Sequence, residues 1–359
     1  MTTSDLDGDG KPEIVTADCD GAVSVLGLDG KVRWRRDGLG RATSVAIARF
    51  SGKPHVIAGA HQSPYIFVFD AAGTRVEGEW AKLDVAADAY KGIATPVRFV
   101  AAADMNGDGT DEVLAASRCA RQEDIRGHIY CYDSAGRMLW QRRPVEHELC
   151  TGAIGAMKPD GPKMFFVGGS FGNCGGVDGT GREAFEAQTS HRSTFICAAD
   201  VDGDGNNEIL IGGQDNYIHL HSADGKRRWM HNVGGPASGI VVADVNGDRK
   251  PEILVTTAEL NANVFALKPD GTRLWQAKAG EEVNTLLLAN VDNRPGDDII
   301  LGTDGAGVLI LDAQGKLITT APTSAPVAKL ALCPSATPNR SDIIAALKNG
   351  SVVRLSTSR

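Results

Sequence analysis

Four segments of the chain carry acidic residues at one repeated spacing. The pattern D-x-[DN]-G-D-[GR]-x-x-E begins at Asp5, Asp104, Asp200 and Asp244. Calcium is bound by about six to eight hard oxygen atoms from carboxylates, backbone carbonyls and water. When such a segment curls, positions one, three and five point inward, position seven offers a backbone carbonyl, and the carboxylate at position nine closes the cage.

The sequence therefore predicts three to four structural calcium sites, and no other cofactor. Glycines within the pattern allow the positive φ angles that the curl requires. The expected ligands, with position seven contributing its backbone carbonyl, are Asp5, Asp7, Asp9, Lys11 and Glu13; Asp104, Asn106, Asp108, Thr110 and Glu112; Asp200, Asp202, Asp204, Asn206 and Glu208; and Asp244, Asn246, Asp248, Lys250 and Glu252.

An EF-hand is the alternative calcium loop, but it needs a glutamate at position twelve and flanking helices. Position twelve here is never acidic, and an apolar run typical of a strand follows; the residues are Thr16, Ala115, Ile211 and Val255. The EF-hand is therefore excluded. Turns rich in Asp and Gly without a metal remain the simpler alternative, but the repetition of one spacing argues against it.

Two copies of the pattern depart from it. Arg249 stands where the other loops have glycine, so that loop is expected to be strained or to bind more weakly. A decayed copy, NVDNRPGDDII, begins at Asn290 and places Arg294 where a ligand oxygen belongs. We expect the Arg294 guanidinium to replace the ion there, paired with Asp292 and Asp298.

The acidic segments recur within a longer repeat, which indicates how they are positioned. Each unit holds short runs rich in Val, Ile and Leu, separated by Gly and Asp turns, a pattern typical of strands. Four short antiparallel strands per unit, repeated radially, predict an all-β fold, the β-propeller. One propeller domain of eight blades is expected, with seven as the alternative, over residues 1–40, 41–90, 91–145, 146–190, 191–234, 235–280, 281–322 and 323–359.

The two end units are expected to be incomplete. Only Met1 to Ser4 precede the first acidic loop, so we expect that unit to lack its leading strand, which an upstream segment would then supply. The last unit is expected to lack its fourth strand, because Arg359 follows soon after its third apolar run.

Composition excludes several classes of function. The chain has 359 residues, a formal net charge of −8 and no basic tract, which argues against nucleic-acid binding. It has no apolar run long enough to span a membrane, and we expect no signal peptide within the given sequence, because its first ten residues, MTTSDLDGDG, contain no charged-then-apolar leader. We expect a monomer.

At the acidic loops the chain resembles the FG-GAP/VCBS repeat family, the calcium-loop propellers typified by the integrin α head. That resemblance implies calcium between the first two strands of a blade, on the lower face, and a glycan or protein ligand on the upper face. It also implies an extracellular or periplasmic location.

A second resemblance is to quinoprotein-like propellers, whose blades end in a glycine followed by a docking tryptophan. Each such aromatic lies four residues after a glycine; the aromatics are Trp34, Trp140, Trp229, Trp275 and Phe185, after Gly30, Gly136, Gly225, Gly271 and Gly181. These rings are expected to fill the wedge between adjacent blades. A quinone cofactor is rejected, because no adjacent cysteine pair exists.

Binding residues are expected in the upper loops, which join strand two to strand three and each blade to the next. The candidates for ligand binding are Arg41, Tyr90, Glu148, His191, Arg192 and Glu282. Three function classes follow: a non-catalytic module that binds a glycan or protein, a lyase of uronate-containing polysaccharides, and a structural scaffold.

A lyase requires a base near a cation that neutralises the uronate carboxylate. The candidates for these roles are His147, His191, Arg192 and Lys91, with Arg41 as a further cation. A glycoside hydrolase would instead need two carboxylates, and Glu148 with Glu282 is the candidate pair.

Overall fold

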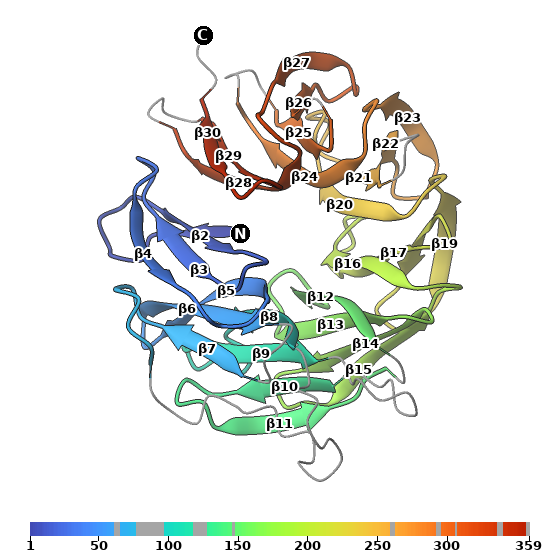
Figure 1. The fold of residues 1–359 in the computed structure, drawn as a ribbon. Helices are drawn as coiled ribbons and strands as arrows, with labels where there is room; N and C mark the ends of the chain where they lie inside the picture. The colour runs from blue at the N-terminus through green and yellow to red at the C-terminus, as the bar shows by residue number, and fades with distance from the viewer. Residues whose placement is uncertain are drawn as a thin grey trace. The chain divides into compact units, whose positions relative to one another are not determined.

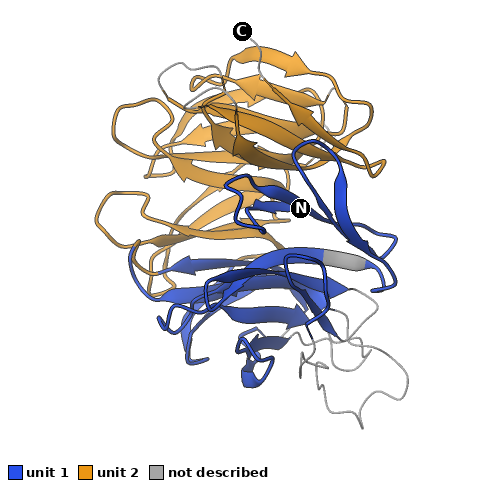
Figure 2. Cartoon of the chain, turned by 90° about the vertical axis from the view of Figure 1, so that its left-hand side faces the viewer, with its two compact units in different colours: residues 1–156, 160–188 blue, residues 157–159, 189–359 orange. Residues whose placement is uncertain are grey.

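The computed structural model describes residues 1–60, 65–76, 97–117, 128–145, 148–258, 263–291, 296–305, 307–335 and 340–356. Within these ranges the chain consists of antiparallel sheets joined by turns (Figure 1). It divides into two compact units, residues 1–156 with 160–188 and residues 157–159 with 189–359 (Figure 2).

The first unit holds four sheets, which we number as blades 1 to 4. Blade 1 is β1 (Thr2–Ser4), β2 (Glu13–Ala17), β3 (Val23–Leu26) and β4 (Val32–Arg36); blade 2 is β5 (Ala42–Phe50), β6 (Lys53–Ala60) and β7 (Ile66–Phe69). Blade 3 is β8 (Val97–Ala103), β9 (Glu112–Ser117), β10 (His128–Tyr132) and β11 (Met138–Arg142); blade 4 is β12 (Leu149–Ala156), β13 (Lys163–Gly169), β14 (Asn173–Asp178) and β15 (Glu183–Gln188).

The second unit holds blades 5 to 8. Blade 5 is β16 (Ser193–Ala199), β17 (Glu208–Gly213), β18 (Tyr217–His221) and β19 (Arg227–Asn232); blade 6 is β20 (Ala237–Ala243), β21 (Glu252–Thr257), β22 (Asn263–Leu267) and β23 (Arg273–Lys278). Blade 7 is β24 (Val283–Ala289), β25 (Asp298–Thr303), β26 (Val308–Leu311) and β27 (Leu317–Ala321); blade 8 is β28 (Val327–Pro334), β29 (Ser341–Leu347) and β30 (Val352–Leu355).

The fold is an all-β propeller with eight blades, as the repeat predicts. Within each unit the first strands of successive blades lie side by side, β5 beside β8 and β20 beside β24. The second and third strands of most blades are largely buried, as in Glu112–Ser117 of β9, because neighbouring blades cover both of their faces. In blade 8, by contrast, no residue of the third strand, β30, is fully buried. Most fourth strands alternate between more buried and exposed residues, as in β4, where Trp34 is buried between exposed Arg33 and Arg35. The fourth strand of blade 7, β27, is instead exposed at four of its five residues.

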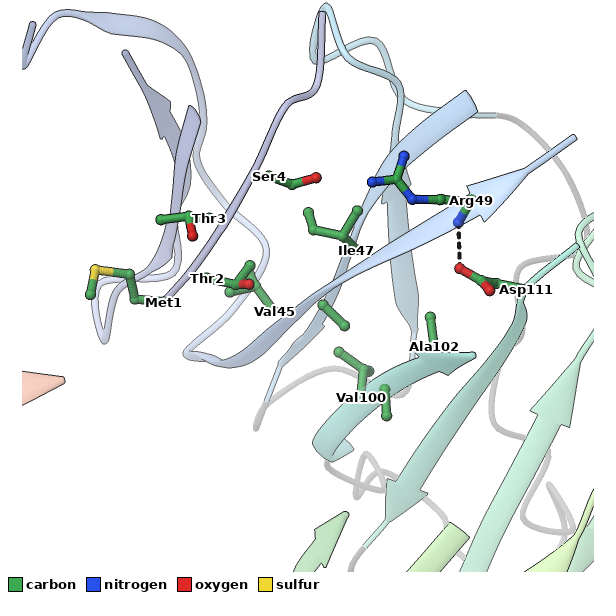
Figure 3. A pocket seen from close by; sticks show the side chains of 12 residues that line it. Met1, Thr2, Thr3, Ser4, Val45, Ile47, Arg49, Val100, Ala102 and Asp111 are labelled. Carbon is green, nitrogen blue, oxygen red and sulfur yellow. Dashed lines mark hydrogen bonds between the residues drawn. The ribbon is translucent and has the colours of Figure 1, made fainter. Parts of the chain in front are cut away.

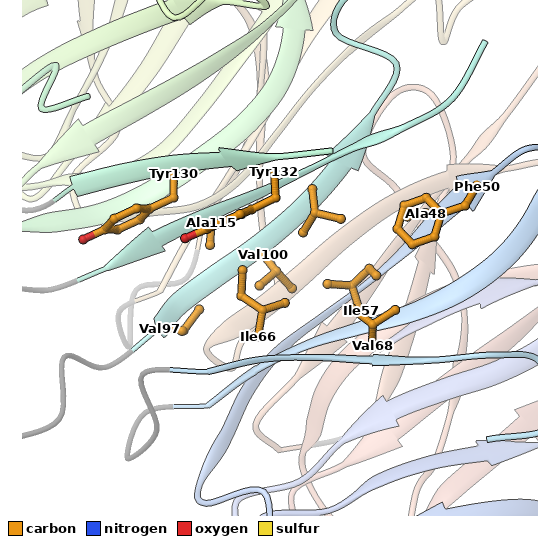
Figure 4. Close-up of a cluster of buried hydrophobic side chains, with 11 residues drawn as sticks. Ala48, Phe50, Ile57, Ile66, Val68, Val97, Val100, Ala115, Tyr130 and Tyr132 are labelled. Carbon is orange, nitrogen blue, oxygen red and sulfur yellow. The ribbon is translucent and has the colours of Figure 1, made fainter. Parts of the chain in front are cut away.

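Apolar side chains from facing sheets hold adjacent blades together. Between blades 2 and 3, one cluster combines Ile57 and Ile66 with Val100 and Tyr130, all of them at most 6% exposed (Figure 4). Burial of such contiguous apolar surface is the main favourable contribution to the free energy of folding.

The prediction that blade 1 lacks its leading strand is wrong. Thr2–Ser4 pairs with β2 in the register Thr2↔Val15 to Ser4↔Glu13, so three residues suffice to complete the sheet. Blade 8 has three strands in the part of the chain that the structure describes, in agreement with the prediction for the last unit.

Candidate metal centres and upper loops

The four acidic segments all lie between the first and second strands of their blades, namely blades 1, 3, 5 and 6. Position six of each loop has a left-handed backbone, with φ of 83° at Gly10 and 81° at Gly205. Arg249 adopts the same conformation, with φ 66°. For a residue with a side chain this costs about 1–2 kcal/mol, so the loop of blade 6 carries the predicted strain.

Within blade 1 the acidic loop is organised by hydrogen bonds from the backbone to the carboxylates. The Asp5 oxygens accept the N–H groups of Gly8 at 2.7 Å and Gly10 at 3.0 Å, and Asp9 accepts that of Lys11 at 2.7 Å. One carboxylate oxygen from each of Asp5, Asp7 and Glu13 lies within 4.8 Å of the others.

Blade 5 repeats this convergence with Asp200, Asp202 and Glu208. Each ionised carboxylate has about four acceptor positions, so an oxygen that accepts an N–H can still face a cation. Oxygen donors of this kind suit a hard divalent ion such as calcium rather than a softer metal. The residues present therefore fit the expected ion.

In blades 3 and 6 the residue at position three is an asparagine, and its amide contacts the glutamate. Asn106 Nδ2 donates to Glu112 Oε1 at 2.8 Å, and Asn246 Nδ2 donates to Glu252 Oε1 at 2.7 Å. Each Oδ1 oxygen accepts the backbone N–H of the aspartate at position five at 2.8 Å, and its second lone pair can still face a cation.

The glutamates at position nine are the most buried acids of the loops. Glu13, Glu112, Glu208 and Glu252 are 3–4% exposed. Burial raises the pKa of each carboxyl, and the neighbouring aspartates raise it further, while the backbone N–H of the residue at position two lowers it. A cation among these groups would favour the ionised form.

In blades 5 and 8 an arginine contacts the acid at position nine or its counterpart. Arg228, from β19, places Nη1 2.7 Å from Asp202 Oδ2 and 3.1 Å from Glu208 Oε1. In blade 8, which has no acidic loop, Arg354 pairs with Asp342 at 2.6 Å. Arg294 and Asp292 lie outside the described residues, and Asp298 accepts the N–H of Val291 at 3.1 Å.

The acidic loops also contact the preceding blade. In blade 3, the Asp111 carboxylate accepts the backbone N–H of Arg49 at 2.7 Å (Figure 3). The backbone N–H of Asp111 also donates to the Arg49 carbonyl at 3.0 Å. The same two residues border a recess of about 480 Å³ lined by β1, β5 and β8, with Thr2, Val45 and Val100 on its walls. The recess holds no pair of groups suited to acid–base chemistry.

Each tryptophan of a fourth strand docks on the next blade of its unit. The indole N–H groups donate at 2.8–3.0 Å to backbone carbonyls, pairing Trp34 with Ala71, Trp140 with Gly179, Trp229 with Pro269 and Trp275 with Ala313. The ring of Trp140 covers Gly181, where a Cβ atom would lie 2.8 Å from Trp140 Cγ. Beyond these contacts, the likeness to quinoprotein blades stays a prediction.

The predicted ligand-binding residues are divided between the two compact units, and their common role stays a prediction. Arg41 and His191 are exposed, Arg192 and Glu282 are half-buried, and Glu148 forms an ion pair with Arg98. Tyr90, Lys91 and His147 lie outside the described residues. Because the members of the Glu148 and Glu282 pair belong to different compact units, the hydrolase hypothesis remains untested.

Sequence reasoning missed several upper-loop groups. Arg98 occupies a bulge near the start of β8, where the register with β9 shifts by one residue. Asn284 occupies the equivalent bulge in β24 and donates to the Val327 carbonyl at 2.8 Å and also to Asp304. Lys348 of blade 8 pairs with the same Asp304 at 2.5 Å. Bulges of this kind are set by strand pairing and leave no composition signal.

The family model of the FG-GAP-like repeat matches residues 200–255, which hold the acidic loop and last three strands of blade 5 and the first strand, acidic loop and start of the second strand of blade 6. The chain contains an FG-GAP-like repeat. A second family model, that of the λ-carrageenase β-propeller domain, matches residues 1–91.

One curated relative aligns with part of the chain. The rhamnogalacturonan endolyase YesW of Bacillus subtilis is 29% identical over 126 residues. The alignment covers 33% of this chain and 19% of that protein.

Similar solved structures support the propeller fold. They include Sqt1 of Saccharomyces cerevisiae, with 10% identity, a TM-score of 0.75 and coverage of 100% of this chain and 99% of that one. BamB of Moraxella catarrhalis has 16% identity, a TM-score of 0.64 and coverage of 100% and 94%. BBS1N, solved in complex with ARL6DN, has 13% identity, a TM-score of 0.61 and coverage of 99% and 91%. At these identities the likeness concerns the fold alone.

No helix within the described ranges is long and apolar enough to cross a membrane.

Proposed function

We propose that this chain is a calcium-stabilised β-propeller that acts outside the cytoplasm and binds a glycan through its upper loops. The observation that carries the calcium part is the convergence of carboxylate oxygens within 4.8 Å in the loops of blades 1 and 5. The glycan part is supported by two relatives, because the λ-carrageenase propeller model and the rhamnogalacturonan endolyase both belong to polysaccharide-active proteins.

Exposed aromatic rings on the upper loops favour a sugar as the ligand. Phe171, between β13 and β14, is 57% exposed, and Tyr65, just before β7, is 40% exposed. Aromatic faces pack against the C–H faces of sugar rings while water remains at the sugar hydroxyls. The Arg98–Glu148 pair lies on the upper side of the same unit and offers charged hydrogen-bond groups.

Binding is tested by calorimetric titration of rhamnogalacturonan, pectin and carrageenan oligosaccharides in calcium buffer. In Phe171→Ala, which loses one stacking ring, the Kd for the oligosaccharide is expected to rise about tenfold. Met138→Ala is the matched control, since Met138 is 50% exposed on the outer strand β11. Equal binding by both variants, or no binding of any polymer, would reject the proposed surface; a protein ligand or a purely structural role would then be favoured.

A polysaccharide lyase is the second candidate, and the similarity to an endolyase favours it. In β-elimination a base removes the proton α to the uronate carboxylate while a cation stabilises the developing charge. His191 and Arg192 adjoin in the connection to β16, and His191 is exposed. The lyase hypothesis predicts unsaturated uronate products, detected by absorbance, that disappear in His191→Ala. If pectin, ulvan, heparin, alginate and rhamnogalacturonan all stay intact, the lyase is excluded.

A further inference from the structure

The acidic loops differ at position three, and a residue of the fourth strand differs with them. Asp7 and Asp202 occupy position three in blades 1 and 5, whose residues before the docking tryptophan are Arg33 and Arg228. Blades 3 and 6 have asparagine at position three, and Leu139 and Leu274 stand before their tryptophans. An extra carboxylate is thus matched by an extra guanidinium.

In blade 5 this pairing is a direct contact. Arg228 Nη1 reaches Asp202 Oδ2 at 2.7 Å and Glu208 Oε1 at 3.1 Å, and both residues belong to the converging carboxylate group. The Arg228 side chain is 38% exposed, whereas that of Glu208 is 4% exposed. The guanidinium therefore approaches from the solvent side and contacts carboxylates that a bound ion would need.

In blades 3 and 6 a neutral group makes the corresponding contact. The Asn106 amide donates to Glu112 Oε1 at 2.8 Å, and the Asn246 amide makes the same bond to Glu252. An amide is neutral and carries an oxygen with a second lone pair that can face a cation, whereas a guanidinium is charged and has donors alone. A metal entering blade 5 must therefore displace a positive charge, and one entering blade 3 need not.

In blade 8 an arginine and two serine side chains donate to the acid at this position. In blade 7 the acid at position nine, Asp298, lies opposite Ala289 of the first strand. In blade 8, Asp342 lies opposite Cys333 of the first strand, so Asp342 occupies the same place in its sheet. The acidic loop is missing there, and Asp342 accepts bonds from Arg354 Nε at 2.8 Å and Nη2 at 2.6 Å.

We propose that Arg228 is a built-in counter-cation that competes with calcium for the acidic loop of blade 5. That loop consequently binds calcium more weakly than it would without Arg228, and it keeps its fold better when calcium is removed. The inference rests on the proposed calcium binding and adds that the loop of blade 5, which has an arginine contact, differs from the loops of blades 3 and 6, where an asparagine amide contacts the glutamate.

Peptide-resolved hydrogen exchange during a calcium titration measures each loop separately in the intact chain. In Arg228→Leu, the calcium concentration at which residues 200–208 reach half of their full protection from exchange should fall roughly tenfold. The variant loses two partly exposed ion pairs, and each changes the equilibrium constant for calcium binding about two- to fivefold. The midpoint for residues 104–112 should not move and serves as the internal control. Without calcium, residues 200–208 should exchange faster in the variant than in the parent.

A reciprocal variant tests the inference should Arg228→Leu fold poorly. Asn106→Asp/Leu139→Arg gives blade 3 the pairing of blade 5, and its calcium midpoint should be roughly tenfold higher than that of Asn106→Asp alone. If calcium protects the loops but neither arginine change moves a midpoint, the counter-cation role is overturned while calcium binding stands. If calcium protects no loop, both fail.

Discussion

The backbone N–H of Asp111, in the acidic loop of blade 3, donates a 3.0 Å hydrogen bond to the carbonyl of Arg49 at the end of β5. Equivalent bonds join Asn207 to Met157 at 2.8 Å and Ser341 to Asn290 at 3.2 Å. Each is made by the residue just before the acid at position nine. Order in these loops is therefore coupled to the packing of a blade against its predecessor.

Because of this coupling, chelation should lower the stability of whole blades rather than of the loops alone. A ligand that is present at a concentration a hundredfold above its Kd raises the free energy of unfolding by about 2.7 kcal/mol for each site. We expect the Tm in calcium to exceed that in chelator by several degrees, as measured by scanning calorimetry. Magnesium at the same concentration is the control. An unchanged Tm would contradict the structural role of the ions.

Removing a docking tryptophan should destabilise two blades together. Trp140 is 8% exposed and hydrogen-bonds to the Gly179 carbonyl of blade 4, so Trp140→Ala should cost about 3–5 kcal/mol. Denaturant unfolding gives this value. A cost below about 1 kcal/mol would show that the wedge between blades 3 and 4 does not depend on the ring.

The glycine beneath that ring permits a matched comparison. Gly181 and Gly30 both have φ of 78°, but a Cβ on Gly181 would meet Trp140 Cγ at 2.8 Å, whereas one on Gly30 would meet nothing within 4 Å. Gly30→Ala therefore reports the backbone cost alone. Gly181→Ala should cost about 1–3 kcal/mol more because of overpacking. Equal losses for the two variants would indicate that the indole can move aside freely.

The Asp342–Arg354 pair predicts one part of the pH dependence of stability. Burial would raise the pKa of Asp342, but hydrogen bonds from Arg354, Ser356 and Ser335 outweigh it and hold the pKa below its ordinary value. A carboxyl with a lowered pKa stabilises the fold above its unfolded-state pKa, and this contribution is lost as the pH falls through the folded-state value.

Asp342→Asn should accordingly cost about 1–2 kcal/mol near neutral pH, and the difference from the parent should shrink below about pH 4. Urea unfolding at a series of pH values provides the measurement. Asp29→Asn is the control, because Asp29 pairs with Lys31 on the surface and should change stability little. A difference that grows as the pH falls would contradict the assigned direction.

The ion pair between Arg98 and Glu148 should be measurable by a double-mutant cycle. The two side chains are 28% and 15% exposed, so water screens them only in part. A coupling free energy of about 1 kcal/mol is expected between Arg98→Met and Glu148→Gln. Additive effects would mean that the pair contributes nothing to the joint between blades 3 and 4.

The sequence by itself determined the local features of the protein. Short apolar runs separated by turns specify strands, the spacing from Asp200 to Glu208 specifies a curled loop rich in oxygen donors, and glycine four residues before Trp229 marks the fourth strand of a blade. Each of these signals lies within about ten residues, where backbone geometry and side-chain chemistry act directly. The short strand Thr2–Ser4 escaped prediction because cross-strand pairing, rather than its composition, stabilises it.

The tertiary structure decided which distant groups meet. Arg228 lies 26 residues from Asp202, and Arg98 lies 50 residues from Glu148. Their contacts depend on strand register, on bulges such as that in β8 and on the packing of one sheet against the next. A register shift of one residue turns a side chain to the opposite face of its sheet, so spacing along the chain does not determine such pairs.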